Sequence, residues 1–96
     1  MGAATPDAHR ASLQIRNKLV LHARAARLFV ETVTRFDAEV TVAKDGQTVN
    51  GRSIMGVMML AAEQGSHIDV ATSGPQAAEA LQAIRDLVDA RFHEKE

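Results

Sequence analysis

The chain has 96 residues, 46% of them hydrophobic and 24% charged, and a formal net charge of −1. These values are typical of one folded domain and exclude a disordered chain, while the near-neutral charge and a total of three aromatic residues, all Phe, argue against nucleic acid as a partner. Cysteine is absent, which excludes disulfides and thiolate metal sites. No apolar run is long enough to cross a membrane, so we expect a cytoplasmic protein without membrane insertion. We also expect a monomer, although the sequence leaves the oligomeric state open.

The first third of the chain predicts a leader, a strand and a helix. Residues 1–10 are small or polar and are expected to form a flexible N-terminal leader. Leu13, Ile15 and Leu19 are separated by polar side chains, a pattern that predicts a first strand and its exit. Residues 23–36 carry apolar side chains at helical spacing and predict a helix with one buried face.

The middle of the chain predicts a β-hairpin. In residues 38–44, Val40 and Val42 fall on one side of a half-buried strand. The dipeptide Asp45-Gly46 that follows is a strong signal for a two-residue turn. Residues 47–50 are therefore expected to pair back as the next strand.

The second half of the chain predicts a short helix, a strand and a long helix. Ser53 is expected to cap the start of the short helix and Gly65 to end it. Residues 67–72 alternate apolar and polar side chains and predict a strand. After the break at 73–75, a helix is expected, whose buried face comprises Ala77, Leu81, Ile84, Leu87, Val88 and Phe92.

This order of elements, βαββαβα, predicts the α+β class. Four strands and three helices are arranged most economically as a two-layer open-faced sandwich, in which a four-stranded antiparallel sheet carries three helices on one face. Residues 11–96 are expected to form this single domain.

The short helix contains three of the four methionines. At about 100° per residue, Ile54, Val57, Leu60 and Ala61 fall on one arc, which is expected to face the sheet. Met55, Met58 and Met59 fall on the opposite arc, together with Ala62. Because flexible thioethers adapt to varied surfaces, we expect the methionines to form a docking surface for protein partners rather than part of the core.

His22 is the strongest candidate for a chemical role. It lies where the apolar residues 19–21 meet the helix expected from Ala23, with Arg24 two positions further on. The first N–H groups of a helix lack partners and carry the positive end of the helix dipole, so an imidazole here would combine a nucleophile with an anion site. This combination suits transfer of a phosphoryl group; a histidine that only caps the helix, or a small anion- or metal-binding protein, is the alternative.

The other three histidines are expected to have no chemical role. His9 lies in the predicted leader, His67 beside a strand and His93 in the charged C-terminal segment. None is followed by an arginine at a predicted helix start, and their spacing is not that of a zinc site. We therefore expect neither a metal nor a cofactor.

Three motifs carry a family resemblance: Leu21-His22-Ala23-Arg24, the Phe-Asp-Ala-Glu-Val run at 36–40, and the Ser-Ile-Met-Gly-Val-Met run at 53–58. Together they resemble the HPr phosphocarrier family, the histidine proteins of the bacterial phosphotransferase system, including the nitrogen-related branch called NPr. The resemblance extends from Ser12 to Phe92, and the histidine and the serine lie 31 positions apart, as the family requires.

The resemblance implies a phosphohistidine carrier rather than a turnover enzyme. In this family the histidine, here His22, takes through its Nδ1 atom a phosphoryl group that enzyme I obtains from phosphoenolpyruvate, and passes it to an enzyme IIA-type acceptor. Arg24 would neutralise the charge of the phosphate. Ser53 matches a serine that an HPr kinase/phosphorylase modifies in some members, and its role as an N-cap alone is an equal alternative.

The resemblance and the methionine stripe together predict partner binding beside His22. Enzyme I and the IIA-type acceptor are expected to share one surface, made of Ala23, Arg27, Ile54, Met55, Met58 and Met59. The sugar branch and the nitrogen-related branch both fit the sequence.

Two positions depart from the family pattern, which usually has glycine before the leucine and proline after the arginine. Here these positions are Val20 and Ala25. Alanine keeps the first helical turn viable, whereas valine disfavours any positive φ that glycine would adopt, so the rate of transfer rather than the fold is expected to change. The departures leave open an HPr-like regulatory binding module that docks partners without histidine phosphotransfer.

Overall fold

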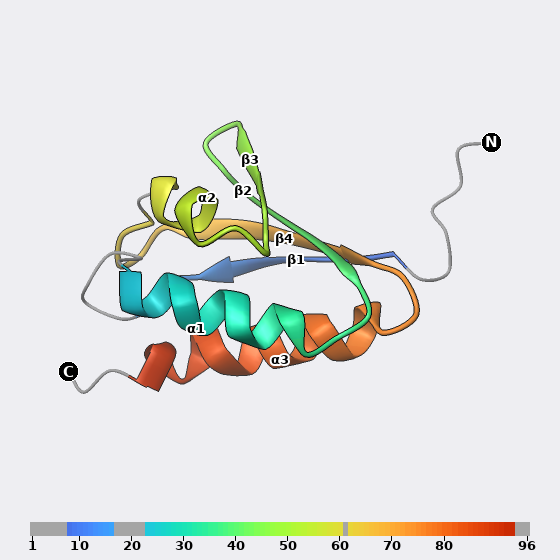
Figure 1. Ribbon diagram of the computed structural model, residues 1–96. Helices are drawn as coiled ribbons and strands as arrows, with labels where there is room; N and C mark the ends of the chain where they lie inside the picture. Colours follow the sequence, from blue (N-terminus) through green and yellow to red (C-terminus); the bar gives the residue numbers. More distant parts are fainter. Residues whose placement is uncertain (1–7, 17–22, 61, 94–96) are drawn as a thin grey trace.

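The computed structural model describes residues 8–16, 23–60 and 62–93. Its elements follow the predicted order βαββαβα, and a short 3₁₀ turn, η1, comes after the last helix (Figure 1). The elements are β1 (His9–Gln14), α1 (Ala23–Thr34), β2 (Glu39–Lys44), β3 (Gln47–Asn50), α2 (Ile54–Met59), β4 (His67–Ser73), α3 (Ala77–Asp89) and η1 (Arg91–His93).

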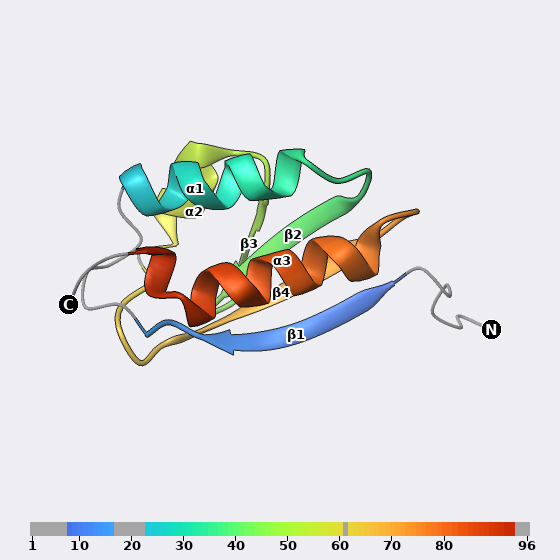
Figure 2. The same ribbon diagram turned by 90° about the horizontal axis from the view of Figure 1, so that it is seen from below.

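The four strands form one antiparallel sheet in the order β1-β4-β2-β3, which confirms the predicted α+β class. The two central strands, β4 and β2, are far apart in the chain but pair directly, with Val42 opposite Val70. Figure 2 shows α1 and α3 side by side as a layer over the sheet. The short helix α2 packs against α1 and β3.

The core lies between the sheet and the helices because the strands alternate in polarity. Val40, Val42, Ile68 and Val70 point into it and are at most 2% exposed, whereas Thr41 between the two valines of β2 is exposed. The helices complete the core with Ala25, Ala26, Phe29, Val33, Val57, Leu81, Ile84, Leu87 and Val88. The opposite face of the sheet carries polar and small side chains.

The hairpin between β2 and β3 confirms the turn prediction. Asp45 and Gly46 have φ values of 52° and 82°. Positive φ at both central residues is the geometry of a type I′ turn, whose twist matches that of the strands it joins. Lys44 therefore pairs with Gln47, the closest pair to the turn.

The predicted leader is too long. His9 and Arg10 belong to β1, where they pair with Thr72 and Ala71 of β4. Residues 9 and 10 are polar and carry no local strand pattern, so their conformation is decided by hydrogen bonding to a strand some 60 positions away. Helix α1 is also shorter than predicted, because it ends at Thr34 rather than at Phe36.

Gly65 does not end α2. The helix ends at Met59 with Leu60 as its C-terminal cap, and Gly65 lies in the turn before β4 with a φ of +89°. The N–H of Gly65 donates to the carbonyl oxygen of Ile15 at 2.8 Å, and the Ile15 N–H donates to Ser66 O at 2.8 Å. The glycine therefore serves a turn that joins the end of β1 to the start of β4.

The last predicted helical residue, Phe92, lies beyond the helix. Helix α3 ends at Asp89, and the predicted face from Ala77 to Val88 is buried as expected. Arg91, Phe92 and His93 have φ values of 55°, 54° and 60°, in the left-handed region. Phe92 is nevertheless fully buried, so the turn brings its ring back onto the core.

Candidate phosphotransfer site

Helix α1 begins at Ala23, as predicted, directly after His22 in the chain. Ala25 is fully buried and therefore fixes the first turn of the helix on the core, while Ala23 and Arg24 are exposed. His22 and Val20 lie outside the described residues. The N–H groups of the first turn, which have no partner within the helix itself, and the positive end of the α1 dipole thus lie next to the histidine in sequence. The helix also forms with alanine at position 25, as expected.

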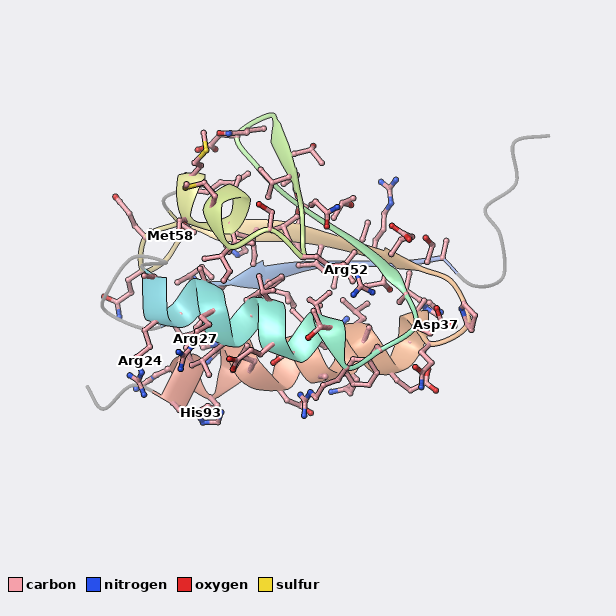
Figure 3. The ribbon with its side chains drawn as sticks, in the orientation of Figure 1. Arg24, Arg27, Asp37, Arg52, Met58 and His93 are labelled. Carbon is pink, nitrogen blue, oxygen red and sulfur yellow. The ribbon has the colours of Figure 1, made fainter. Side chains whose placement is uncertain are left out.

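Arg27 lies one turn further along α1 and is exposed. Its Nε atom is 3.5 Å from Oε2 of Glu31, an ion pair between residues four positions apart on the same helix. Figure 3 shows Arg24, Arg27 and Met58 at the same end of the molecule, where α1 begins. A basic edge therefore borders this end of the helix layer.

Ser53 is the N-cap of α2, as predicted. Its backbone is extended, with φ −102° and ψ 112°, and its Oγ accepts a hydrogen bond from the Gly56 N–H at 3.0 Å. This bond satisfies one of the N–H groups that the first turn leaves without a helical partner. The serine is half-buried.

Arg52 is a positioning residue that we did not predict. Its Nη2 atom donates to the carbonyl oxygens of Ala38 at 2.7 Å and Phe36 at 3.2 Å, both in the connection between α1 and β2. The Arg52 N–H donates to Oδ1 of Asn50 at 2.8 Å. The residue before the α2 cap is thus tied to the segment that follows α1. In the sequence, the only signal is an arginine beside a predicted N-cap.

Two of the three methionines of α2 are exposed, as predicted. Met55 and Met59 are 69% and 62% exposed, so they are available to a partner. Met58 is partly buried against the core, and Ile54, which we expected to face the sheet, is 40% exposed. The exposed apolar patch of α2 therefore consists of Ile54, Met55 and Met59, and we call it the α2 patch.

The predicted arcs were wrong at Met58 and Ile54, which lie within α2, and at Ala62, which lies beyond the end of this six-residue helix. Val57 and Leu60 are buried as expected, but Ala62, expected on the exposed arc, is fully buried beyond the end of the helix. Ala61 lies outside the described residues. A projection at 100° per residue applies only where the helix continues.

Comparison with known proteins gives the family. A sequence profile described as the PTS HPr component phosphorylation site matches residues 9–90. The chain is 49% identical over 85 residues to the phosphocarrier protein HPr of Neisseria meningitidis serogroup A, a match that covers 88% of this chain and 96% of the relative. The chain belongs to the HPr family.

Solved HPr structures have the same fold. The HPr of Thermoanaerobacter tengcongensis superposes with a TM-score of 0.86 and 39% identity, covering 92% of this chain and 99% of that one. The HPr of Bacillus anthracis gives a TM-score of 0.80 and 44% identity, with 84% and 96% covered. The HPr-family resemblance and the predicted fold are thus both confirmed.

The other three histidines of this HPr-family chain lie in separate elements of the structure. His9 pairs in β1, His67 begins β4 and His93 lies in η1. Over residues 8–16, 23–60 and 62–93, no group of three or more His, Asp or Glu side chains is arranged to hold a metal ion. In the same part of the chain, no helix is long and apolar enough to cross a membrane.

Proposed function

We propose that this protein accepts a phosphoryl group on His22 from enzyme I and passes it to an enzyme IIA-type protein. One observation carries this proposal. Helix α1 starts at the residue directly after His22, and its first turn is anchored by the fully buried Ala25. A phosphoryl group on the imidazole would therefore be next to helical N–H groups and to Arg24, which favour negative charge.

The reaction consists of two displacements at phosphorus. In the first, Nδ1 of the neutral His22 imidazole attacks the phosphoryl group of enzyme I, and the bond from phosphorus to the donor breaks as the N–P bond forms. In the second, the acceptor nucleophile attacks the same phosphorus, and the N–P bond breaks. Electrons return to the imidazole, so His22 is regenerated and the protein is a carrier between two partners.

Arg24 is proposed to stabilise the charge on the transferred group. A guanidinium presents a planar fork of donors that can bind two phosphate oxygens at once, which the ammonium of lysine cannot reproduce. Replacing Arg24 with Lys should therefore slow transfer from enzyme I about tenfold or more, a loss of roughly 1.4 kcal/mol in the transition state. Rapid-quench phosphorylation assays with the same donor measure this rate.

Arg27→Lys is the matched control, because Arg27 is also an exposed arginine on the first turns of α1, and its Nε lies 3.5 Å from Oε2 of Glu31. Its rate should stay within about twofold of the wild type, since exposed pairs contribute little. Equal transfer rates for the wild type and Arg24→Lys would show that Arg24 does not stabilise the transferred group.

The α2 patch is proposed to be the docking surface for both partners. Two methionines and an isoleucine are exposed together on one short helix, and the basic edge formed by Arg24 and Arg27 lies at the same end of α1 that α2 packs against. Ala23 and the partly buried Met58 would border the contact. Flexible thioethers suit a surface that must fit two different partners in turn. Binding of enzyme I and of the acceptor should be mutually exclusive.

Replacing Met55 with Glu should weaken binding of both partners by about 1 kcal/mol or more, because the interface would have to desolvate a charge. The free energy of unfolding should change by only about 0.5 kcal/mol, since the side chain is 69% exposed. Calorimetric titration of each partner and thermal melting measure the two effects. Met55→Leu, which keeps the site apolar, should bind nearly as well as the wild type. Unchanged binding with a large loss of stability would show that docking occurs elsewhere.

Ser53 is proposed to act first as the cap of α2. Its Oγ already accepts a hydrogen bond from the Gly56 N–H, and this hydrogen bond defines the cap. Phosphorylation there by an HPr kinase/phosphorylase would add about two negative charges beside the α2 patch and would oppose docking. Incubation with such a kinase, followed by mass spectrometry of the chain and of Ser53→Ala, tests this modification directly.

Val20 and Ala25 support a second candidate, a regulatory module of the same fold that binds partners without phosphotransfer. A solved relative whose name refers to catabolite repression is the Bacillus subtilis protein Crh, which superposes with a TM-score of 0.70 at 38% identity, with 82% of this chain and 91% of that chain covered. Partner binding by a chain that enzyme I cannot phosphorylate would favour the second candidate. Transfer to sugar-specific or nitrogen-related IIA acceptors, compared side by side, assigns the branch.

A further inference from the structure

A groove lies between α1 and α3 and is bordered by η1. It consists of two overlapping hollows of about 200 and 260 Å³, both lined by Thr32, Arg35, Leu87 and His93. Each hollow is several times the roughly 30 Å³ of a water molecule and below the ~300 Å³ at which sites for drug-sized ligands begin. The groove therefore has room for one small molecule. Nothing in the proposed phosphotransfer uses it.

Thr32 supplies a buried polar group without a partner in this groove. The residue is 8% exposed, and its hydroxyl makes no hydrogen bond in the part of the chain that the structure describes. A helical threonine usually donates to a carbonyl three or four positions earlier, as Thr34 does to Glu31 O at 3.0 Å. Buried hydroxyls are nearly always satisfied, so the Thr32 hydroxyl indicates a ligand or solvent atom in the groove.

Arg35 and His93 give the groove hydrogen-bond donors. Within the described residues, neither side chain forms an ion pair, and the guanidinium of Arg35 contacts only the ring of Phe36, 5.7 Å from its centroid. A guanidinium with free donors binds a carboxylate through two parallel hydrogen bonds. One end of a ligand is therefore expected to be a carboxylate.

Two carboxylates also line the groove, and they are not equivalent. Glu31 is paired with Arg27 at 3.5 Å. Asp86 accepts a hydrogen bond from Nε2 of Gln82 at 3.0 Å, and because that amide is neutral, the charge of Asp86 is not compensated by it. A second group of the ligand is therefore expected to be cationic.

We propose that this groove binds an α-amino acid with an aliphatic side chain. Its carboxylate forms an ion pair with Arg35 and accepts a hydrogen bond from the Thr32 hydroxyl. Its ammonium forms an ion pair with Asp86. The apolar side chain packs on Leu28 of α1 and Leu87 of α3, which both line the larger hollow. Complementary charges at the two ends and an apolar wall distinguish such a zwitterion from a simple anion.

The test is a titration of the ¹⁵N-labelled full chain with L-leucine, followed by NMR. We expect saturable shifts at Thr32, Leu87 and His93 and a dissociation constant on the order of 1 mM, as befits a small ligand in an open groove. Isoamylamine lacks the carboxylate and 4-methylpentanoate lacks the ammonium, so each should bind at least tenfold more weakly. Equal binding of all three, or no saturable shifts, would overturn the proposal and leave water as the occupant.

Substitutions inside and outside the groove test where L-leucine binds. Arg35→Gln and Asp86→Asn should each weaken L-leucine at least tenfold, and Thr32→Val, which keeps the shape but removes the hydroxyl, should weaken it several-fold. Arg85→Gln is the control, because Arg85 is exposed on α3 outside the groove. Unchanged binding in Arg35→Gln and Asp86→Asn would overturn the proposal, as would shifts confined to the start of α1. His22→Ala should bind L-leucine normally, which separates this site from the phosphotransfer site.

Discussion

Replacement of His22 with alanine is expected to abolish phosphorylation by enzyme I and phosphoenolpyruvate completely. The alanine side chain has no nucleophile, and no other residue is proposed to carry the phosphoryl group. The modification on the wild-type protein should be stable in base and labile in acid, as an N–P bond is. Labelling from radioactive phosphoenolpyruvate, followed by acid and base treatment, measures both properties.

His67→Ala is the matched control for this prediction. His67 is an exposed histidine at the first residue of β4, outside the proposed site, so its removal should leave labelling unchanged. Far-UV circular dichroism of both variants establishes that the fold is retained. Histidine labelling of His22→Ala to the wild-type level would refute the assignment, whatever the outcome for the control.

Replacement of Phe92 with alanine should have the largest effect on stability. The ring is fully buried in the hydrophobic core, and its removal leaves a cavity that the surrounding structure can fill only in part. Losses for such substitutions are about 3–5 kcal/mol, a large share of the roughly 5–15 kcal/mol by which a domain is stable. Urea unfolding followed by circular dichroism measures the free energy.

The neighbouring His93 provides the comparison. It has the same left-handed backbone, with a φ of 60°, but its side chain is exposed, so His93→Ala should cost less than about 1 kcal/mol. A similar small loss for Phe92→Ala would mean that the ring contributes nothing to the core. The two variants together separate the effect of burial from that of the turn conformation.

The sequence predicted best those features that depend on neighbouring residues. Asp45-Gly46 specifies its turn because both positions tolerate positive φ, and Ser53 specifies its cap because its hydroxyl reaches an N–H three residues ahead. The buried face of α3 also follows from spacing alone. In each case the decisive interaction lies within a few positions of the residue concerned.

The features that were missed depend on residues distant in the chain. His9 and Arg10 are in a strand because β4 pairs with them, and α2 ends at Met59 although the apolar pattern continues beyond it. Phe92 is buried through a left-handed turn that its own side chain disfavours. At the candidate site, the family motifs predicted His22, Arg24 and Ser53. Arg52 was missed because its hydrogen bonds go to the carbonyls of Phe36 and Ala38, which are distant in the chain.

The strand order β1-β4-β2-β3 has a consequence for synthesis of the protein. The hairpin of β2 and β3 can close as soon as both strands have been translated, but the first strand made, β1, pairs only with β4, which begins at residue 67. At a translation rate of roughly 5–20 residues per second, β1 therefore remains unpaired for several seconds before β4 has been synthesised. Until then its backbone donors and acceptors are open to chaperones, proteases and other nascent chains. Quality control of this protein is thus expected to act on its N-terminal strand.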